Sequence, residues 1–184
     1  LLGRAVLKKD RDGYETRYRY TPSGKREEIL YGDGRRAQYH YDAAGNLTGV
    51  EDWNGTTTFI NDALGRVVQT IYPGGESVSC RYGRRGERTG LVYPDGTEAE
   101  YRYGKGQRLE ELLTRTGEGA QESIRYRYDE KGRLAEKELP NGVHTFYYLT
   151  NAGQFDSMEC KIEGNLLENL RMSYDCLGNR IGLE

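Results

Sequence analysis

The sequence has little of what a thick hydrophobic core or a catalytic centre needs. Only 35% of its 184 residues are hydrophobic, against a usual apolar share of roughly 45–50%. It contains one Trp, two His and three Cys. No apolar run approaches the roughly 18 residues that a membrane-spanning helix needs. We therefore expect neither a large closed core nor insertion into a membrane.

The sequence also has no large excess of charge of one sign. The 27 basic and 29 acidic residues are interspersed and give a formal net charge of −2. A protein that binds nucleic acid or an anionic membrane usually carries a basic patch, so we expect neither partner. The cysteines (Cys80, Cys160 and Cys176) are odd in number and form no C-x-x-C pair, which excludes a dense disulfide framework.

The few residues suited to catalysis or metal binding lack partners in the sequence. His40 and His144 have no Cys, His or acidic residue at ligand spacing, so we expect solvated histidines on strands. The chain is built of repeats, described below, and Cys80 occupies a position where other repeats have a tyrosine. We therefore predict that Cys80 is a small buried hydrophobe, and that Cys176, which lies in a predicted turn, is exposed. The sequence therefore predicts no catalytic residue, no metal site, no cofactor and no enzymatic activity.

Glycine, by contrast, is abundant and regularly spaced. One glycine marks each unit of about 21 residues, which is typical of a tandem array of one small structural element. We therefore predict a single array over residues 1–184, with about eight to nine units, as a fragment of a larger assembly. The marker glycines are Gly3, Gly24, Gly45, Gly65, Gly86, Gly106, Gly132, Gly153 and Gly178.

A second glycine follows ten residues later in six of the units. The residue before it is Asp, Asn or Gly, and such pairs tolerate positive φ at both centres of a type I′ turn, so we predict β-hairpins of that type. These pairs are Asp12-Gly13, Asp33-Gly34, Asn54-Gly55, Gly74-Gly75, Asp95-Gly96 and Asn141-Gly142.

Aromatic residues alternate in the segment before each marker turn, which places them on one face of a strand. The segment after the marker glycine is apolar more loosely, and we expect it to fill the space between tyrosines. The result is an all-β fold of tandem hairpins in a curved, single-layer antiparallel sheet. The aromatic positions are Tyr18, Tyr20, Tyr39, Tyr41, Phe59, Tyr82, Tyr101, Tyr103, Tyr126, Tyr128, Tyr147 and Tyr174.

An aspartate follows the aromatic pair in several units and begins the marker turn. Asp42, Asp62, Asp129 and Asp175 recur once per turn, without the nonapeptide pattern of calcium-binding β-rolls, so we expect them to cap turns. Gly-Lys-Gly at 104–106 lacks the spacing of a phosphate-binding loop and also predicts a turn.

Several irregularities interrupt the period. Extra residues near 116–121 and 163–165 predict longer hairpin loops. The turn at Gly106 is one residue short, so we expect a local kink there. If the array stands alone, strand edges near Tyr14–Tyr20 and Leu170–Tyr174 should be unpaired and should favour self-association.

The aromatic pair and the turn together resemble a known repeat. Tyr-His-Tyr-Asp-Ala-Ala-Gly-Asn-Leu at 39–47 and Tyr-Arg-Tyr-Asp-Glu-Lys-Gly-Arg-Leu at 126–134 are similar to the tyrosine-aspartate (YD) repeat. That repeat occurs in bacterial Rhs proteins, in the B and C components of Tc toxins and in teneurins. The segments at 59–67 and 172–180 share its register, with Asn61 in place of the second tyrosine and Met172 in place of the first.

The resemblance implies a segment of a hollow β-sheet shell that encloses a C-terminal toxin or effector domain of a secreted or surface-displayed bacterial protein. Its partners would be the rest of its own shell and the enclosed domain. Bacterial members usually end the shell with a self-cleaving Asp-Pro element, and this sequence has no Asp-Pro pair. A glycan- or adhesion-binding surface module is the alternative, because aromatic and glycine-rich repeats also build such modules. Those modules are characteristically rich in Trp, and here Trp53 is alone.

Overall fold

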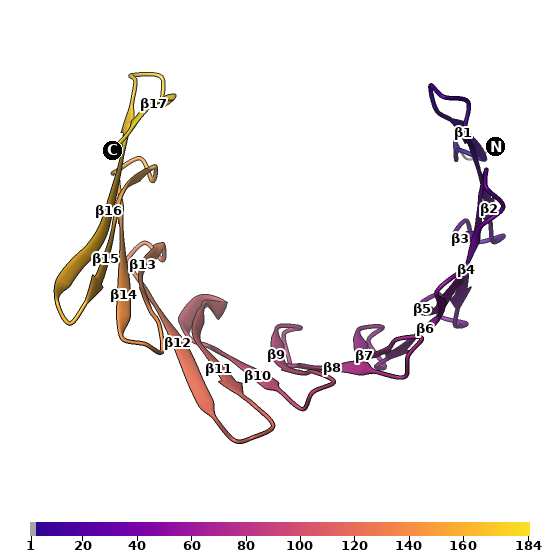
Figure 1. Ribbon diagram of the computed structural model, residues 1–184, viewed down its shortest axis with the longest axis horizontal. Helices are drawn as coiled ribbons and strands as arrows, with labels where there is room; N and C mark the ends of the chain where they lie inside the picture. Colours follow the sequence, from indigo (N-terminus) through magenta and orange to yellow (C-terminus); the bar gives the residue numbers. More distant parts are fainter. Residues whose placement is uncertain (1–2) are drawn as a thin grey trace. The chain divides into compact units, whose positions relative to one another are not determined.

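The computed structural model describes residues 3–184 and contains 17 strands and one short 3-10 turn (Figure 1). The described residues form two compact units: residues 3–81 with Leu91–Pro94 form unit 1, and Tyr82–Gly90 with Asp95–Glu184 form unit 2. No helix among residues 3–184 has the length and apolar character needed to cross a membrane. Leu1 and Leu2, at the expected start of the first repeat, lie outside the described residues.

The strands follow one another along the chain as hairpins. Within unit 1 they are β1 (Leu7–Lys9), β2 (Glu15–Tyr20), β3 (Arg26–Tyr31), β4 (Arg36–Tyr41), β5 (Leu47–Asp52), β6 (Gly55–Asn61), β7 (Val67–Ile71) and β8 (Ser77–Tyr82), the last residue of β8 belonging to unit 2. β9 (Arg88–Val92) is divided between the units. Within unit 2 they are β10 (Glu98–Tyr103), β11 (Leu109–Arg115), β12 (Gln121–Tyr128), β13 (Leu134–Glu138), β14 (Val143–Leu149), β15 (Phe155–Ile162), β16 (Asn165–Tyr174) and β17 (Arg180–Leu183).

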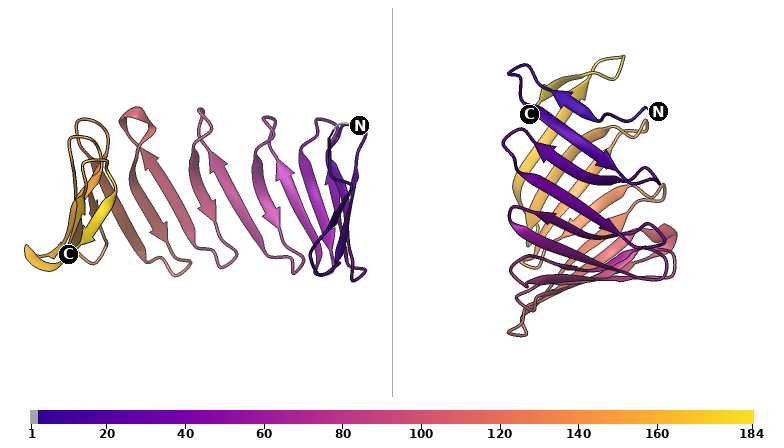
Figure 2. Two further views of the ribbon diagram at one scale, coloured as in Figure 1. Left: turned by 90° about the horizontal axis from the view of Figure 1, so that it is seen from above. Right: turned by 90° about the vertical axis from the view of Figure 1, so that its right-hand side faces the viewer.

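In each unit, strands that follow one another along the chain pair antiparallel, in a single layer (Figure 2). The prediction of an all-β antiparallel sheet of tandem hairpins is therefore confirmed. Such a sheet satisfies its backbone by neighbour-to-neighbour pairing and needs no second layer to do so.

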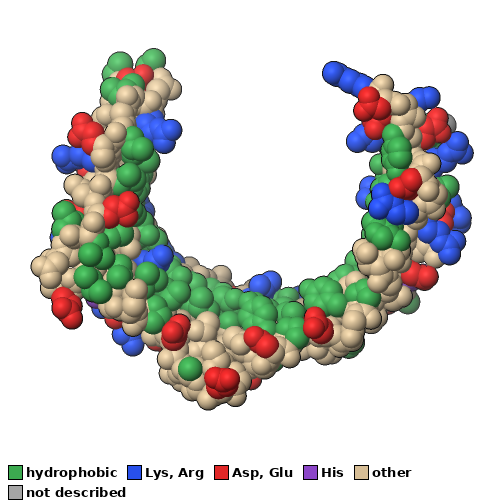
Figure 3. Space-filling view, in the orientation of Figure 1, with side chains coloured by type: hydrophobic (Ala, Val, Ile, Leu, Met, Phe, Trp, Pro, Cys, Tyr) green, Lys and Arg blue, Asp and Glu red, His purple; other side chains and the backbone are tan. Residues whose placement is uncertain are grey.

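The two faces of the sheet differ in composition because side chains alternate along each strand. On one face, which we call the tyrosine face, Tyr18 lies opposite Ile29, and Ile29 lies opposite Ala37. On the other, which we call the charged face, Arg19 lies opposite Glu28. Figure 3 shows the hydrophobic side chains gathered along one side of the strands, with most charged side chains on the other side and at the turns.

The buried core is thin, as expected from the low hydrophobic content. Five hydrophobic side chains count as buried among the described residues: Ile29, Ala37, Leu91, Ala99 and Leu113. None of the described side chains is completely removed from solvent. The tyrosines themselves are mostly half-buried, so their rings contribute apolar area without forming an enclosed interior.

The turns differ from the type I′ turns that the Asp-Gly and Asn-Gly pairs predicted. In the hairpin from Tyr31 to Arg35, the amide of Gly34 donates to Tyr31 O (3.0 Å) and the amide of Tyr31 donates to Arg35 O (2.8 Å). Gly34 has φ of 88°, whereas Asp33 is not among the residues with positive φ. This is a type I turn followed by a glycine bulge, a common three-residue hairpin connection. The type I′ prediction is wrong for all six pairs, because only the glycine of each has positive φ.

The marker turns have the same geometry. At the turn that starts at Asp42, the amide of Gly45 donates to Asp42 O (2.9 Å) and the amide of Asp42 donates to Asn46 O (3.0 Å). One turn type therefore closes both ends of these hairpins. Its left-handed fourth residue explains why the sequence has two regular series of glycines.

The turn near Gly106 corrects the alignment of the repeats. The amide of Gln107 donates to Gly104 O (3.2 Å), so Gln107 occupies the position that glycine holds in the other marker turns. Gln107 has φ of 58° and lies 21 positions after Gly86. The register shift at Tyr103 also falls where it does in the other units, before the turn. The repeat is therefore complete, and the predicted short turn is wrong because Gln107, not Gly106, holds the marker position. The local irregularity is the single 3-10 turn Lys105–Gln107.

The extra residues near 116–121 and 163–165 lengthen strands instead of loops. The turn from Thr116 to Ala120 has the standard hydrogen bonds, and the strands on either side, β11 and β12, have 7 and 8 residues. Ile162 and Asn165 pair across a two-residue turn in which Glu163 (φ 49°) and Gly164 (φ 81°) both have positive φ. This turn has the pattern of type I′, at a place where the sequence prediction had put a longer loop.

The edges predicted to be open are covered. β2 pairs with β1 through Glu15–Arg17, and β16 pairs with β17 through Met172–Tyr174. The prediction placed the edges one strand too far inward at each end, because both short terminal strands lack the aromatic pair that marked strands in the sequence.

Candidate functional site

The element that recurs through both units is the marker turn, and its aspartate holds it closed. At Asp42, Oδ1 accepts the amide of Asn46 (2.7 Å) and Oδ2 accepts Asn46 Nδ2 (2.9 Å). The same carboxylate clamps the residue four positions later in three further turns: Asp62 with Arg66, Asp129 with Arg133, and Asp175 with Asn179. These aspartates therefore act as caps of their own turns.

The clamp lowers the pKa of its aspartate. Hydrogen bonds from the side chain and the backbone of Arg66 lower the pKa of Asp62, and those from the backbone and the side chain of Arg133 lower the pKa of Asp129. Hydrogen bonds from Asn46 and Asn179 act in the same direction on Asp42 and Asp175. Hydrogen bonds to the ionised carboxylate favour its charged form.

This clamp predicts acid sensitivity. Because the folded pKa lies below the unfolded value of about 3.9, the stabilisation is present above that pH and is lost as pH falls through the folded pKa. We expect Asp129→Asn to be less stable at pH 7 and to lose less stability between pH 5 and pH 2, measured by urea unfolding. Asp12→Asn, whose carboxylate accepts no hydrogen bond from residues 3–184, serves as the control. A parallel pH profile for Asp129→Asn and the parent sequence would contradict the clamp.

The second tyrosine of a repeat is hydrogen-bonded to the repeat before it. Tyr41 Oη donates to Arg26 O at 2.9 Å, across 15 positions of sequence. Tyr20 and Tyr128 make the equivalent bond to Ala5 O and Leu109 O, both at 2.8 Å. In the unit where asparagine replaces this tyrosine, Asn61 Nδ2 donates to Leu47 O at 2.8 Å. The substitution at Asn61 therefore keeps the cross-unit hydrogen bond and gives up the ring.

The side chain of the residue after the marker position contacts the next repeat. The Lys25 ammonium lies 5.2 Å from the centre of the Tyr41 ring and donates to Gly45 O in the following marker turn. Arg4 and Arg108 lie over Tyr20 and Tyr128 at 5.7 and 5.8 Å. In two further units Arg133 donates to Thr150 O (3.1 Å) and Gln154 to Gly178 O (3.4 Å). The only signal of this position in the sequence is a long polar side chain after the marker residue in each of these repeats.

The charged face carries a ladder of ion pairs in unit 2. Arg102 contacts Glu111 at 2.7 Å, and Arg127 contacts Glu136 at 2.8 Å. Arg125 bridges Glu111 and Glu138 at 3.5 and 3.3 Å. The arginines are more than half exposed, so each pair contributes little to stability by itself. The ladder gives this face alternating charge without an excess of one sign.

Both histidines lie on the charged face. His40 lies on β4 opposite Gly49 and belongs to no metal-binding group among residues 3–184. His144 Nδ1 lies 2.7 Å from Glu136 Oε1, a partner that the sequence spacing did not show, so His144 is not the fully solvated histidine that we expected. Burial raises the pKa of Glu136, but hydrogen bonds from His144 and Arg127 outweigh it and lower the pKa overall. No group of three or more His, Cys, Asp or Glu within residues 3–184 could hold a metal ion.

The cysteines lie apart as free thiols. Cys80 is half-buried on β8 instead of fully buried, and Cys176 is exposed in its turn. Cys160 is half-buried, with its sulfur 3.6 Å from Thr145 Oγ1. Within residues 3–184, the one hydrogen-bond partner of a thiol is the Thr145 hydroxyl, which is not a base.

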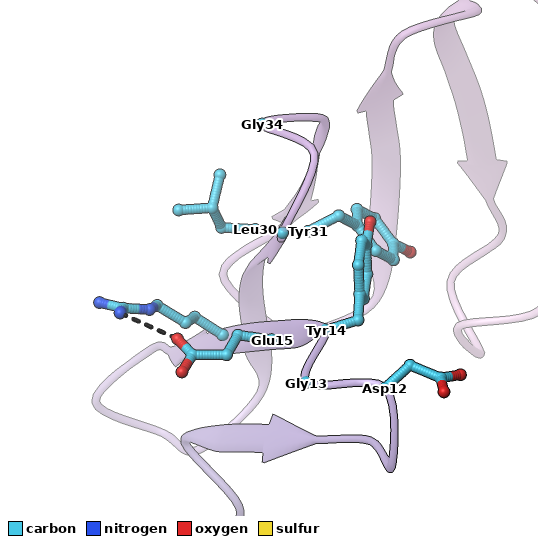
Figure 4. A pocket seen from close by; sticks show the side chains of 9 residues that line it. Asp12, Gly13, Tyr14, Glu15, Leu30, Tyr31 and Gly34 are labelled. Carbon is cyan, nitrogen blue, oxygen red and sulfur yellow. Dashed lines mark hydrogen bonds and ion pairs between the residues drawn. The ribbon is translucent and has the colours of Figure 1, made fainter.

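A hollow of about 740 Å³ opens beside the first hairpins of unit 1. Its lining includes Tyr14 and Tyr31, whose rings lie beside each other, and Glu15, which is engaged with Arg17 at 3.2 Å (Figure 4). The amide of Asp33 donates to Tyr14 Oη at 3.3 Å, so the tyrosine hydroxyl is partly used within the fold.

Trp53 lies at the turn between β5 and β6, at the same edge of the sheet as the turn between β3 and β4. It is 50% exposed. The Tyr31 ring approaches it edge-on at 5.6 Å between centroids, and the Arg35 guanidinium lies 4.6 Å from its centre. The tryptophan thus packs against the preceding turn, and Arg35 covers part of the ring.

Comparison with known proteins agrees with this repeated architecture. The family model described as Teneurin YD-shell matches residues 2–118. Double-stranded DNA deaminase toxin A of Burkholderia cenocepacia is 30% identical over 170 residues, covering 82% of this chain and 12% of that protein. The chain therefore spans about one eighth of the length of this relative.

Solved structures show the same fold at low sequence identity. The TcdB2-TccC3-TEV crystal structure has a TM-score of 0.72 at 12% identity, covering 97% of this chain and 12% of that one. The Tc holotoxin pore of Photorhabdus luminescens has a TM-score of 0.69 at 14% identity, covering 99% of this chain and 12% of that one. The tyrosine-aspartate turns, the hairpin sheet and the match over residues 2–118 lead to one conclusion: the chain belongs to the teneurin YD-shell family.

Proposed function

We propose that the chain is a non-enzymatic wall segment of a YD shell that encloses a toxin or effector domain, within a longer secreted or surface-displayed bacterial protein. Its partners are the other segments of that shell and the enclosed domain. The relatives support this proposal, because one is a DNA deaminase toxin and another is a Tc holotoxin, and each is about eight times longer than the aligned segment.

The observation that carries the proposal is the coupling of each repeat to the repeats before and after it. Tyr41 bonds to the preceding unit, and Lys25 reaches from its own marker turn to the next. Together with strand pairing, these ties build a continuous sheet one layer thick. A layer of this kind separates two spaces without a core of its own, which is what the wall of an enclosure requires.

The polar residues that could suggest catalysis already have structural partners. Asp129 clamps its turn, Glu136 binds His144 and Arg127, and Tyr128 bonds to a backbone carbonyl. This use of polar groups supports a structural role, with any toxin activity in a different part of the longer protein.

Limited proteolysis with intact-mass spectrometry on the longer parent protein tests the proposal. We expect a fragment outside the repeats to resist digestion and to co-elute with repeat-bearing material. The control is the same digestion after the shell has been unfolded in urea, where this fragment should be cleaved. Rapid digestion of everything outside the repeats in the native protein would overturn the enclosure.

A glycan-binding surface module is the second candidate, favoured by exposed aromatic residues at successive hairpin turns of unit 1. Trp53, Tyr72 and Tyr93 are 50%, 45% and 41% exposed. Exposed aromatic rings are a common contact for sugars as well as for proteins. Binding to a glycan array that is lost in Tyr72→Ala and retained in Tyr148→Ala, on the charged face of unit 2, would favour this function.

A further inference from the structure

A step in one rim of unit 2 leaves part of a strand without a partner. The β11–β12 hairpin reaches further than the neighbouring β13–β14 hairpin (Figure 1). β12 begins at Gln121, but its pairing with β13 begins only at Arg125, opposite Glu138. Residues 121–124 of β12 therefore pair with β11 on one side and with no strand of residues 3–184 on the other.

The register shows which backbone groups face the open side. The amide of Thr116 donates to Ala120 O, and Thr114 lies opposite Glu122, so Ala120 and Glu122 direct their backbone groups toward β11. Groups alternate along an antiparallel strand, so those of Gln121 and Ser123 point the other way, toward the space beyond β13. Each of these two residues presents one N–H and one C=O on that side.

The end of β13 explains why the step persists. Continuing the register from Arg125 and Glu138 would place Pro140 opposite Ser123. Proline has no N–H, so it cannot complete the ladder at that point. The chain turns there instead, with the amide of Leu139 donating to Val143 O at 2.8 Å.

The step also forms a cavity that is bordered by acidic side chains. A cavity of about 420 Å³ lies there, lined by Gln121, Glu122, Leu139, Pro140 and Asn141. Leu139 and Pro140 supply an apolar floor. Glu122 and, in the adjacent turn, Glu118 make no ion pair with residues 3–184. A strand that entered the step would therefore be favoured if it carried Lys or Arg.

We propose that the step accepts a short extended segment bearing Lys or Arg, which pairs with Gln121 and Ser123 and packs on Leu139 and Pro140. Strand addition of this kind gives affinity through main-chain hydrogen bonds and specificity through side chains. A second copy pairing antiparallel through the same segment would bring Glu122 of the two copies close together, which is unfavourable.

The segment comes from the same longer polypeptide, an assignment that rests on the proposed function. An edge of four residues offers too few hydrogen bonds to hold a separate peptide tightly. A tethered segment has a high effective concentration and fills such an edge without tight intrinsic binding. The relatives, about eight times longer than the aligned region, have ample chain to supply it.

Hydrogen exchange with fragment-resolved mass spectrometry tests the proposal by comparing the longer parent with the 184-residue chain. We expect the amides of Gln121 and Ser123 to exchange about 100-fold more slowly in the parent. The amide of Glu122 faces β11 and should be protected in both proteins, so it serves as the control. Equally fast exchange of Ser123 in the two proteins would overturn the proposal.

Charge reversal identifies what fills the step. Glu122→Lys in the parent should speed exchange at Ser123 about tenfold, whereas Glu130→Lys, the same change on the opposite rim, should leave it unaltered. Protection of Ser123 in the 184-residue chain that grows with its concentration would show a second copy in the step and would also overturn the proposal. These outcomes do not depend on whether a toxin fragment resists proteolysis, so a failed enclosure and a failed strand addition are distinguishable.

Discussion

Replacement of Tyr128 by alanine is expected to lower the free energy of unfolding by about 3 kcal/mol. The ring lies opposite Leu134 on the tyrosine face and beneath the Arg108 guanidinium, 5.8 Å from its carbon. Its hydroxyl donates to Leu109 O at 2.8 Å, and burial raises the pKa of Tyr128. The variant would lose apolar contact, a cation–π contact and a hydrogen bond between units. Urea unfolding followed by tyrosine fluorescence and circular dichroism would measure the change.

Two controls divide this effect into its parts. Tyr128→Phe keeps the ring and should cost about 1 kcal/mol, the contribution of one hydrogen bond. Tyr148→Ala removes a tyrosine from the charged face, where the ring is 43% exposed, and should cost less than about 1 kcal/mol. An equal loss for Tyr128→Ala and Tyr148→Ala would show that the tyrosine face is not the main packing surface.

Replacement of Gly75 by alanine is expected to cost about 1–2 kcal/mol, while the same change at the adjacent Gly74 should stay within about 0.5 kcal/mol. Neither added Cβ would meet an atom within 4 Å, so steric crowding does not separate the two. Gly75 has φ of 87°, whereas Gly74 is outside the positive-φ group. The pair therefore isolates the backbone strain of the left-handed turn position, measured as the difference in unfolding free energy.

The reciprocal substitution provides the check. Gln107 occupies the same position of its turn with φ of 58°, so Gln107→Gly should stabilise the chain by up to about 1 kcal/mol. Stabilisation is limited because glycine also gains freedom in the unfolded state. A loss of stability in Gln107→Gly, or equal costs at Gly74 and Gly75, would mean that the strain of the left-handed position does not govern these turns.

The periodic features of the fold could be predicted from the sequence because they depend on local chemistry. Glycine at a left-handed turn position and aromatic residues at every second position produce a pattern that can be recognised in the sequence alone. The hairpins and the two faces follow from that pattern. One wrong prediction has its cause in a repeat position filled by a different residue: Gln107 replaces the marker glycine, and the neighbouring Gly106 resembles it in the sequence.

Features that join units were harder to predict because no local pattern encodes a partner in another hairpin. The exchange of a tyrosine hydroxyl for the Asn61 amide is visible only when both are seen donating to an equivalent carbonyl. The His144–Glu136 pair joins adjacent strands across eight positions, which ligand-spacing rules do not cover. The rim step depends on where β13 stops relative to β12, and that needs the register.

The reach of each tie sets how such a protein can change in size. Tyr41 contacts the unit before it and Lys25 contacts the unit after it, so no residue described here needs to recognise a distant repeat. Duplication of one unit of about 21 residues would insert two strands and widen the sheet by about 10 Å, with every new contact already specified by the copied sequence. Gene duplication thus lengthens such a sheet in steps of one repeat, without the redesign of an interior that an enlarged globular domain would require.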